Sequence, residues 1–140
     1  MLKKAILTIE DCGALSFLMS TVLQKDFTVT SVPDYGQAIS HLQQDLDKDV
    51  IIMNIDDAES DNYALLEYIS TSAILNDIRT VVISNSDDET LRNKTAELGA
   101  SLFLTKPFDP VYLSDSVKNM TRSGGKEVKR NRFSFNMNIF

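Results

Sequence analysis

Apolar and polar residues alternate in blocks along the first 120 residues. Five short apolar runs, rich in Val, Ile, Leu and Thr, have the length of β-strands, and each is followed by a segment with helical spacing of its apolar residues. Strands are expected at residues 4–9, 27–32, 50–53, 78–83 and 102–104, with a helix after each. This alternation predicts an α/β domain, a doubly wound parallel sheet with helices on both faces.

Capping residues and apolar stripes define the expected helices more closely. N-caps are expected at Asp34, at Asp61 or Asn62, at Asp87 and at Asp109, which precedes Pro110. Gly99 is expected just beyond the end of the fourth helix. The inner faces of the first three helices are expected to be Ala14, Phe17, Leu18 and Val22; Ala38, Ile39, Leu42 and Leu46; and Ala64, Leu65, Tyr68 and Ile69.

The last 20 residues differ from the rest of the chain. A glycine pair leads into the basic run KEVKRNR, and the chain closes with FSFNMNIF, in which apolar and polar residues alternate. Period-two alternation is typical of a strand, and a strand needs a sheet edge to pair with. We therefore divide the chain into a domain at 1–120 and a basic tail at 121–140. The tail either stays solvated or adds a C-terminal strand to this sheet or to a second chain.

Charge is distributed unevenly along the chain. The formal net charge is −6, yet the tail carries five Lys and Arg against one Glu, so the body is more acidic than the whole. An acidic body is a poor match for the phosphates of nucleic acids and suits a cation or a basic protein partner. We expect no signal peptide and no membrane span, and the single Cys12 fits a reducing, cytoplasmic setting.

Polar side chains follow four of the five expected strands. Glu10 and Asp11 come after the first strand, Asn54 after the third, Ser84 after the fourth and Lys106 after the fifth. Because the carboxyl ends of parallel strands meet at one edge, these side chains can share a pocket. Such a pocket has most of the parts for phosphoryl transfer to a carboxylate: acids for Mg²⁺, and a cation and a hydroxyl for the phosphoryl oxygens. The nucleophilic carboxylate is missing.

Four motifs stand in order along the chain: ILTIED, DVIIMNIDDAESDN, VVISN and LGASLFLTKPFDPVYL. Together they make residues 3–120 resemble a response-regulator receiver domain of two-component signalling. The resemblance implies a flavodoxin-like (βα)5 fold with strand order 2-1-3-4-5. It places Ser84, Phe103 and Lys106 at the positions that contact the phosphoryl group or switch on activation.

Two features depart from the family pattern. Asn54 stands where the family has its phosphorylated aspartate, and the following loop, DDAESDN, lacks the usual Pro and Gly. An amide oxygen is a far poorer nucleophile than a carboxylate and brings no negative charge to a metal. The Mg²⁺ site that the resemblance implies, at Glu10, Asp11 and Asp56, is therefore expected to be weak or absent.

Structural roles compete with these functional ones. Glu10 and Asp11 can pair with Lys106 without any metal, which is the interpretation we adopt. Asp56 is expected to be a solvated loop acid. Alternatively, its carboxylate could replace the negative charge that the pocket lacks because Asn54 is an amide. Ser84 can be an ordinary hydroxyl at the end of a strand. Phe103 can be an ordinary core residue or part of a partner surface.

The leading functional hypothesis is a signalling module, not an enzyme, that acts by protein contact without phosphorylation. Its expected partners are a histidine kinase or other signalling proteins, through the face of the fourth helix, fifth strand and fifth helix, which could also form a homodimer. One alternative is a Mg²⁺-dependent phosphoacceptor that uses Asp56 or Asp11, and another is an assembly protein that pairs through its tail. A nucleotide-binding protein is disfavoured, because EDCGAL has one glycine where the phosphate loop needs three.

Overall fold

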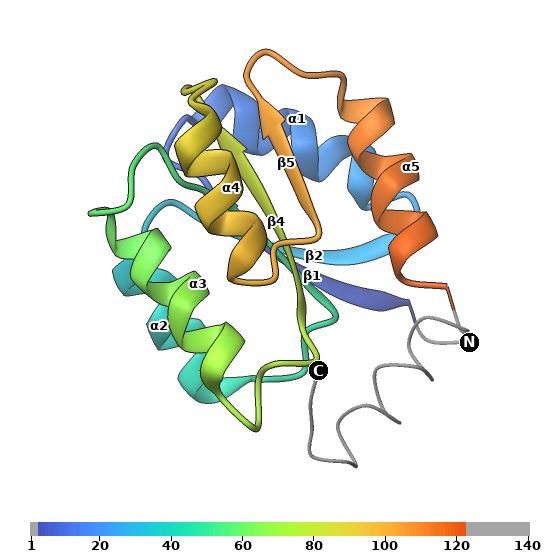
Figure 1. The fold of residues 1–140 in the computed structure, drawn as a ribbon. Coiled ribbons are helices and arrows are strands. Elements are labelled where there is room, and N and C mark those ends of the chain that lie inside the picture. Colours follow the sequence, from blue (N-terminus) through green and yellow to red (C-terminus); the bar gives the residue numbers. More distant parts are fainter. Residues whose placement is uncertain (1–2, 123–140) are drawn as a thin grey trace.

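The computed structural model describes residues 3–122, which form five strands alternating with five helices (Figure 1). The strands are β1 (Lys4–Ile9), β2 (Phe27–Val32), β3 (Val50–Asn54), β4 (Arg79–Ser84) and β5 (Leu102–Thr105). The helices are α1 (Gly13–Leu23), α2 (Tyr35–Gln44), α3 (Asp61–Thr71), α4 (Glu89–Glu97) and α5 (Pro110–Met120). All ten predicted elements are therefore confirmed, with small shifts at their ends.

All strand pairs in the sheet are parallel, and the strand order is β2-β1-β3-β4-β5. The predicted fold class and strand order are thus confirmed. Parallel pairing also brings every strand's carboxyl end to the same edge of the sheet. That edge is where side chains from different strands can meet.

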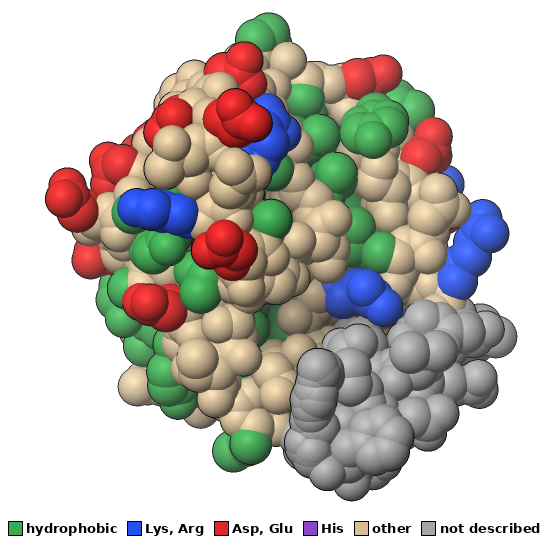
Figure 2. Space-filling model, viewed as in Figure 1, with side chains coloured by type: hydrophobic (Ala, Val, Ile, Leu, Met, Phe, Trp, Pro, Cys, Tyr) green, Lys and Arg blue, Asp and Glu red, His purple; other side chains and the backbone are tan. Residues whose placement is uncertain are grey.

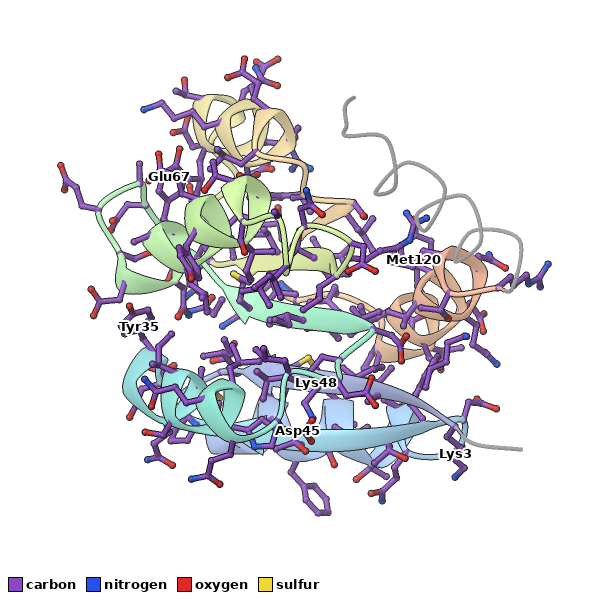
Figure 3. The ribbon with its side chains drawn as sticks, turned by 90° about the horizontal axis from the view of Figure 1, so that it is seen from below. Lys3, Tyr35, Asp45, Lys48, Glu67 and Met120 are labelled. Carbon is purple, nitrogen blue, oxygen red and sulfur yellow. The ribbon has the colours of Figure 1, made fainter. Side chains whose placement is uncertain are left out.

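Helices pack against both faces of the sheet, and each face has its own hydrophobic cluster. α1 and α5 cover one cluster, and α2, α3 and α4 cover the other. Alternate residues of β3 enter opposite clusters: Val50 and Ile52 face α1 and α5, while Ile51 and Met53 face the other helices. Figure 3, in which the molecule is seen from below, shows side chains filling the space on both sides of the sheet. The continuous apolar run of β3 is explained by this burial on both faces.

The predicted inner face of α1 is wrong. Phe17 is 73 % exposed and Leu18 is 45 % exposed, while Met19 and Leu23 are fully buried. The segment GALSFLMSTVL is apolar on nearly every side, so its sequence alone does not identify the side that meets the sheet. Tyr68, on α3, and Leu46, which lies beyond the end of α2, are also exposed, contrary to the predicted stripes.

The helix ends follow the predicted capping chemistry with two corrections. Asp34 and Asp109 cap α2 and α5 as predicted, and Gly99 has the positive φ of +94°. Ser60 caps α3 in place of the predicted Asp61 or Asn62, and Asp88 caps α4 in place of Asp87. Both corrections fall in runs of successive capping residues, SDN and DD, where several positions are chemically equivalent.

The basic run and the predicted C-terminal strand, at residues 123–140, lie outside the described residues. Within residues 3–122, no helix combines the length and the apolar character needed to cross a membrane.

Candidate functional site

Side chains from four strands lie together at the carboxyl edge of the sheet. Asn54 and Ser84 are the last residues of the neighbouring strands β3 and β4, and Glu10 and Lys106 directly follow β1 and β5. Glu10 and Ser84 are buried, with 2 % and 0 % of their surface exposed. Two polar contacts organise this edge, one around Glu10 and one around Asp56.

The first contact is an ion pair between Glu10 and Lys106. Lys106 Nζ lies 2.9 Å from Glu10 Oε1, and the side chains are 16 % and 0 % exposed. Glu10 Oε2 accepts a hydrogen bond of 2.9 Å from Cys12 N, and Oε1 has no hydrogen-bond partner among the described residues beyond the ion pair. The predicted ion pair is confirmed for Glu10. It is wrong for Asp11, which is exposed and lines a shallow hollow beside α1.

The Asn54 side chain faces the loop that follows β3. Its Nδ2 atom lies 3.4 Å from Asp56 Oδ2, and its Oδ1 atom is buried without a hydrogen-bond partner among residues 3–122. Its backbone oxygen accepts a hydrogen bond of 2.8 Å from Asn62 Nδ2, which ties the strand end to α3. Asn54 therefore acts as a donor to an acid and offers no ionisable oxygen of its own.

The second contact is a set of hydrogen bonds that converge on the Asp56 carboxylate. Asp56 Oδ1 accepts from Ser84 Oγ at 3.1 Å and from Asn85 N at 2.7 Å. Asp56 Oδ2 accepts from Asn85 Nδ2 at 3.3 Å and from Asn54 Nδ2 at 3.4 Å. The expectation that Asp56 is a solvated loop acid is therefore wrong, because its side chain bridges two loops.

These contacts also set the ionisation of Asp56. Partial burial of the carboxylate acts to raise its pKa, but hydrogen bonds from the Asn85 backbone, the Ser84 hydroxyl and the side chains of Asn85 and Asn54 act more strongly in the other direction. The pKa of Asp56 consequently lies below its ordinary value. Asp56 is an anion at neutral pH, with both oxygens engaged by donors.

A third polar cluster, which the sequence did not indicate, lies beside β5. The guanidinium of Arg92, on α4, lies 4.5 Å from the centre of the Phe103 ring. Its Nη2 atom lies 3.0 Å from Asp87 Oδ1 and 3.4 Å from Thr105 Oγ1. Phe103 is therefore held between the sheet and an arginine. These residues come together only because α4 packs against β5, so no local sequence motif identifies the cluster.

The fold and this edge agree with the comparison to known families. The family model for the response regulator receiver domain matches residues 6–118. The chain therefore belongs to the response-regulator receiver domain family, and it is a receiver domain of two-component signalling.

Individual relatives agree with this assignment. The chain is 29 % identical over 110 residues to the two-component response regulator ORR5 of Oryza sativa subsp. japonica, covering 78 % of this chain and 82 % of that protein. It is 31 % identical over 123 residues to the transcriptional regulatory protein KdpE of Staphylococcus aureus, covering 86 % of this chain and 51 % of KdpE. The crystal structure of the Mn(2+)-bound form of response regulator Rcp1 superposes with a TM-score of 0.68 at 25 % identity, covering 86 % of this chain and 94 % of Rcp1.

Receiver domains bind Mg²⁺, which takes oxygen ligands such as the carboxylates at this edge. Glu10 is engaged by Lys106 and Cys12, Asp56 is engaged by four donors from Ser84, Asn85 and Asn54, and Asp11 is exposed. Among residues 3–122, no group of three or more His, Cys, Asp or Glu side chains could hold a metal ion. Glu10, Asp11 and Asp56 therefore do not form one cluster of free carboxylates in this arrangement.

Proposed function

We propose that this receiver domain acts through protein contact and does not depend on phosphorylation. The observation that carries the proposal is the pair formed by Asn54 and Asp56. The residue at the end of β3 is an amide, and the nearest acid in the loop has both oxygens engaged in hydrogen bonds. Attack on a phosphoryl group requires a free carboxylate oxygen, and an oxygen that accepts two hydrogen bonds is weakened as a nucleophile.

The cation of the pocket is also engaged. Lys106 is bound to the buried Glu10 at 2.9 Å, and moving it toward an incoming phosphoryl group would leave the Glu10 carboxylate unpaired in the interior. Charge neutralisation inside the chain thus competes with binding of an external anion. By the same reasoning, we propose that Mg²⁺ binding at Glu10, Asp11 and Asp56 is weak or absent.

We propose that the docking surface is the face formed by α4, β5 and α5. All four residues of β5 are half-buried, and β5 is the outermost strand of the described sheet on that side. Val111 and Tyr112, on α5, are 57 % and 54 % exposed. Figure 2 shows hydrophobic side chains between α4 and α5 and acidic side chains over α4. A protein partner, either another signalling protein such as a histidine kinase or a second copy of this chain, suits a surface of this mixed character.

The test is incubation with acetyl phosphate and Mg²⁺, followed by intact-mass measurement. We expect the wild-type mass to stay unchanged, while a receiver domain with an intact aspartate gains one phosphoryl group in parallel. A stoichiometric adduct that disappears in Asp56→Asn or Asp11→Asn, and persists in the neighbouring Asp57→Asn, would favour the Mg²⁺-dependent phosphoacceptor and overturn the proposal.

A further inference from the structure

One carboxylate connects the loop after β3 with the loop after β4. Asp56 belongs to the first loop, and three of its four donors come from the last residue of β4 and the loop that follows it: Ser84 Oγ, Asn85 N and Asn85 Nδ2. The sequence separation between these residues is 28 and 29 positions, so the contact is tertiary and not a local turn. Hydrogen bonds to a charged acceptor are stronger than those between neutral groups, so the Asp56 carboxylate makes a strong polar connection between the two segments.

From Asp56 the hydrogen bonds continue step by step to the N-terminus of α4. Ser84 Oγ accepts from Ser86 N at 3.0 Å, and Ser86 Oγ accepts from Asp88 N at 3.1 Å. Asp88 Oδ1 then accepts from Thr90 N at 3.2 Å, which caps α4. The carboxylate therefore stands at one end of a series of hydrogen bonds that are linked through Ser86 and Asp88 and that end on the helix.

The buried hydroxyl in this series depends on the anion. Ser84 is fully buried, and its proton needs an acceptor, because an unsatisfied buried donor carries a large desolvation cost. In the family pattern a phosphoryl oxygen is the acceptor toward which this hydroxyl moves. In this chain a side chain from the neighbouring loop fulfils that need.

We propose that the Asp56 carboxylate is a permanent internal anion that takes the place of a phosphoryl group and positions the β4–α4 loop and the start of α4. The domain then holds one arrangement of this loop without covalent modification. Asp56 is a positioning residue for the face formed by α4, β5 and α5. That consequence for docking rests on the proposed function, whereas the role of the carboxylate in ordering the loop stands on the hydrogen bonds alone.

The decisive readout is the amide hydrogen exchange of Asn85. Asn85 is exposed, and its N–H is bonded to Asp56 Oδ1 at 2.7 Å, so loss of the carboxylate should expose the amide directly to water. We expect Asp56→Ala to accelerate Asn85 exchange by on the order of tenfold or more. Sodium formate, which restores a free carboxylate to the vacated space, should reverse much of this acceleration.

The matched control is the adjacent residue. Asp57 Oδ1 accepts a hydrogen bond from Glu59 N within its own loop, so Asp57→Ala should leave Asn85 exchange unchanged and should not respond to formate. Asp56→Asn keeps the shape of the side chain and removes its charge. It provides a second measurement of Asn85 exchange if the alanine variant folds poorly. Unchanged Asn85 exchange in a folded Asp56→Ala or Asp56→Asn protein, or equal acceleration in Asp57→Ala, would overturn the inference.

This outcome is separable from that of the proposed function. The acetyl phosphate experiment measures covalent modification of the wild-type protein, whereas the exchange experiment measures the order of one loop in the absence of any phosphate donor. If only the exchange prediction fails, the receiver domain is still not phosphorylated, but Asp56 does not order the loop after β4. If only the mass prediction fails, Asp56 still orders this loop, but phosphorylation can displace its carboxylate.

Discussion

At the scale of single residues, the amide of Asn54 alters the charge balance of the pocket. The described pocket holds one cation, Lys106, and the carboxylates of Glu10 and Asp56. Each carboxylate has its own set of partners, and the Asn54 amide donates to one of them. An aspartate at this position would place a third negative charge beside Asp56, where the present structure has a hydrogen-bond donor.

The Glu10–Lys106 ion pair should make a measurable contribution to stability. Lys106→Met leaves the fully buried Glu10 carboxylate without its cation, and we expect the free energy of unfolding to fall by about 3 kcal/mol. The double variant Glu10→Gln/Lys106→Met removes both charges and should recover much of this loss. Chemical denaturation of these two variants and of Glu10→Gln, each relative to wild type, measures the coupling. A double variant whose loss equals the sum of the losses in the two single variants would show that the pair is not energetically linked.

Asp56 should make stability depend on pH in one direction. Its pKa in the folded protein is lowered, so ionisation stabilises the fold at pH values above the ordinary aspartate pKa of about 3.9. That contribution is lost as pH falls through the lower pKa of the folded state. The difference in unfolding free energy between wild type and Asp56→Asn should therefore be constant near neutral pH and shrink below about pH 4. A difference that grows on acidification would contradict this ionisation state.

The residues at this edge were predictable to different degrees. Asn54, Ser84 and Lys106 could be found from sequence, because strand ends and family motifs mark them. The role of Asp56 could not be found from the sequence, since an acid in a polar loop has the same local sequence pattern whether its side chain faces water or a neighbouring loop. Arg92 was missed for a related reason: its contact with Phe103 depends on how α4 lies across β5.

At the scale of elements, α4 is fixed at both ends by local chemistry. Asp88 caps its first turn, and the chain leaves it through Gly99 at a φ of +94°. Capping residues of this kind are readable from sequence, although the exact position shifts where two candidates are adjacent. The inner face of a uniformly apolar helix such as α1 is not readable, because the sheet selects it.

Gly99 offers a direct test of the α4 terminus. A Cβ at Gly99 would meet nothing within 4 Å, so Gly99→Ala should cost only the backbone strain of a positive φ, about 1–2 kcal/mol. Gly13, in α1, is equally open and has no positive φ, so Gly13→Ala should be neutral or slightly stabilising. Equal effects of the two variants on the denaturation midpoint would argue against the strained conformation at Gly99.

For the whole molecule, the alternation of strands and helices along the sequence predicted more of the fold than any single motif did. Five short apolar runs that alternate with segments of helical spacing predict a parallel sheet, and the observed strand order is the one that the family resemblance implies. Surface function is less accessible from sequence. Phe17 and Tyr112 are both exposed aromatic residues on helices, and nothing in their local sequences distinguishes the proposed docking face from the rest of the surface.

These two aromatic residues form a matched pair for testing the docking face. We expect reversible self-association of the wild-type protein in sedimentation velocity, weakened by roughly tenfold in Tyr112→Glu, because a charge on α5 would be desolvated at the interface. Phe17→Glu places the same charge on α1, outside the proposed face, and should have no effect. Weakening by Phe17→Glu and not by Tyr112→Glu would place the interface at α1, outside the face formed by α4, β5 and α5.

We propose that the pocket does not accept a phosphoryl group, because the Asp56 carboxylate already accepts hydrogen bonds from the groups that would bind it. This can be measured by a ¹H–¹⁵N NMR titration of the wild-type protein with beryllofluoride, a phosphoryl mimic, in the presence of Mg²⁺. We expect the amide resonances of Ser84, Asn85 and Lys106 to stay in place throughout. Saturable shifts of these three resonances would show that the site still takes up a phosphoryl-like group, and would contradict the proposal.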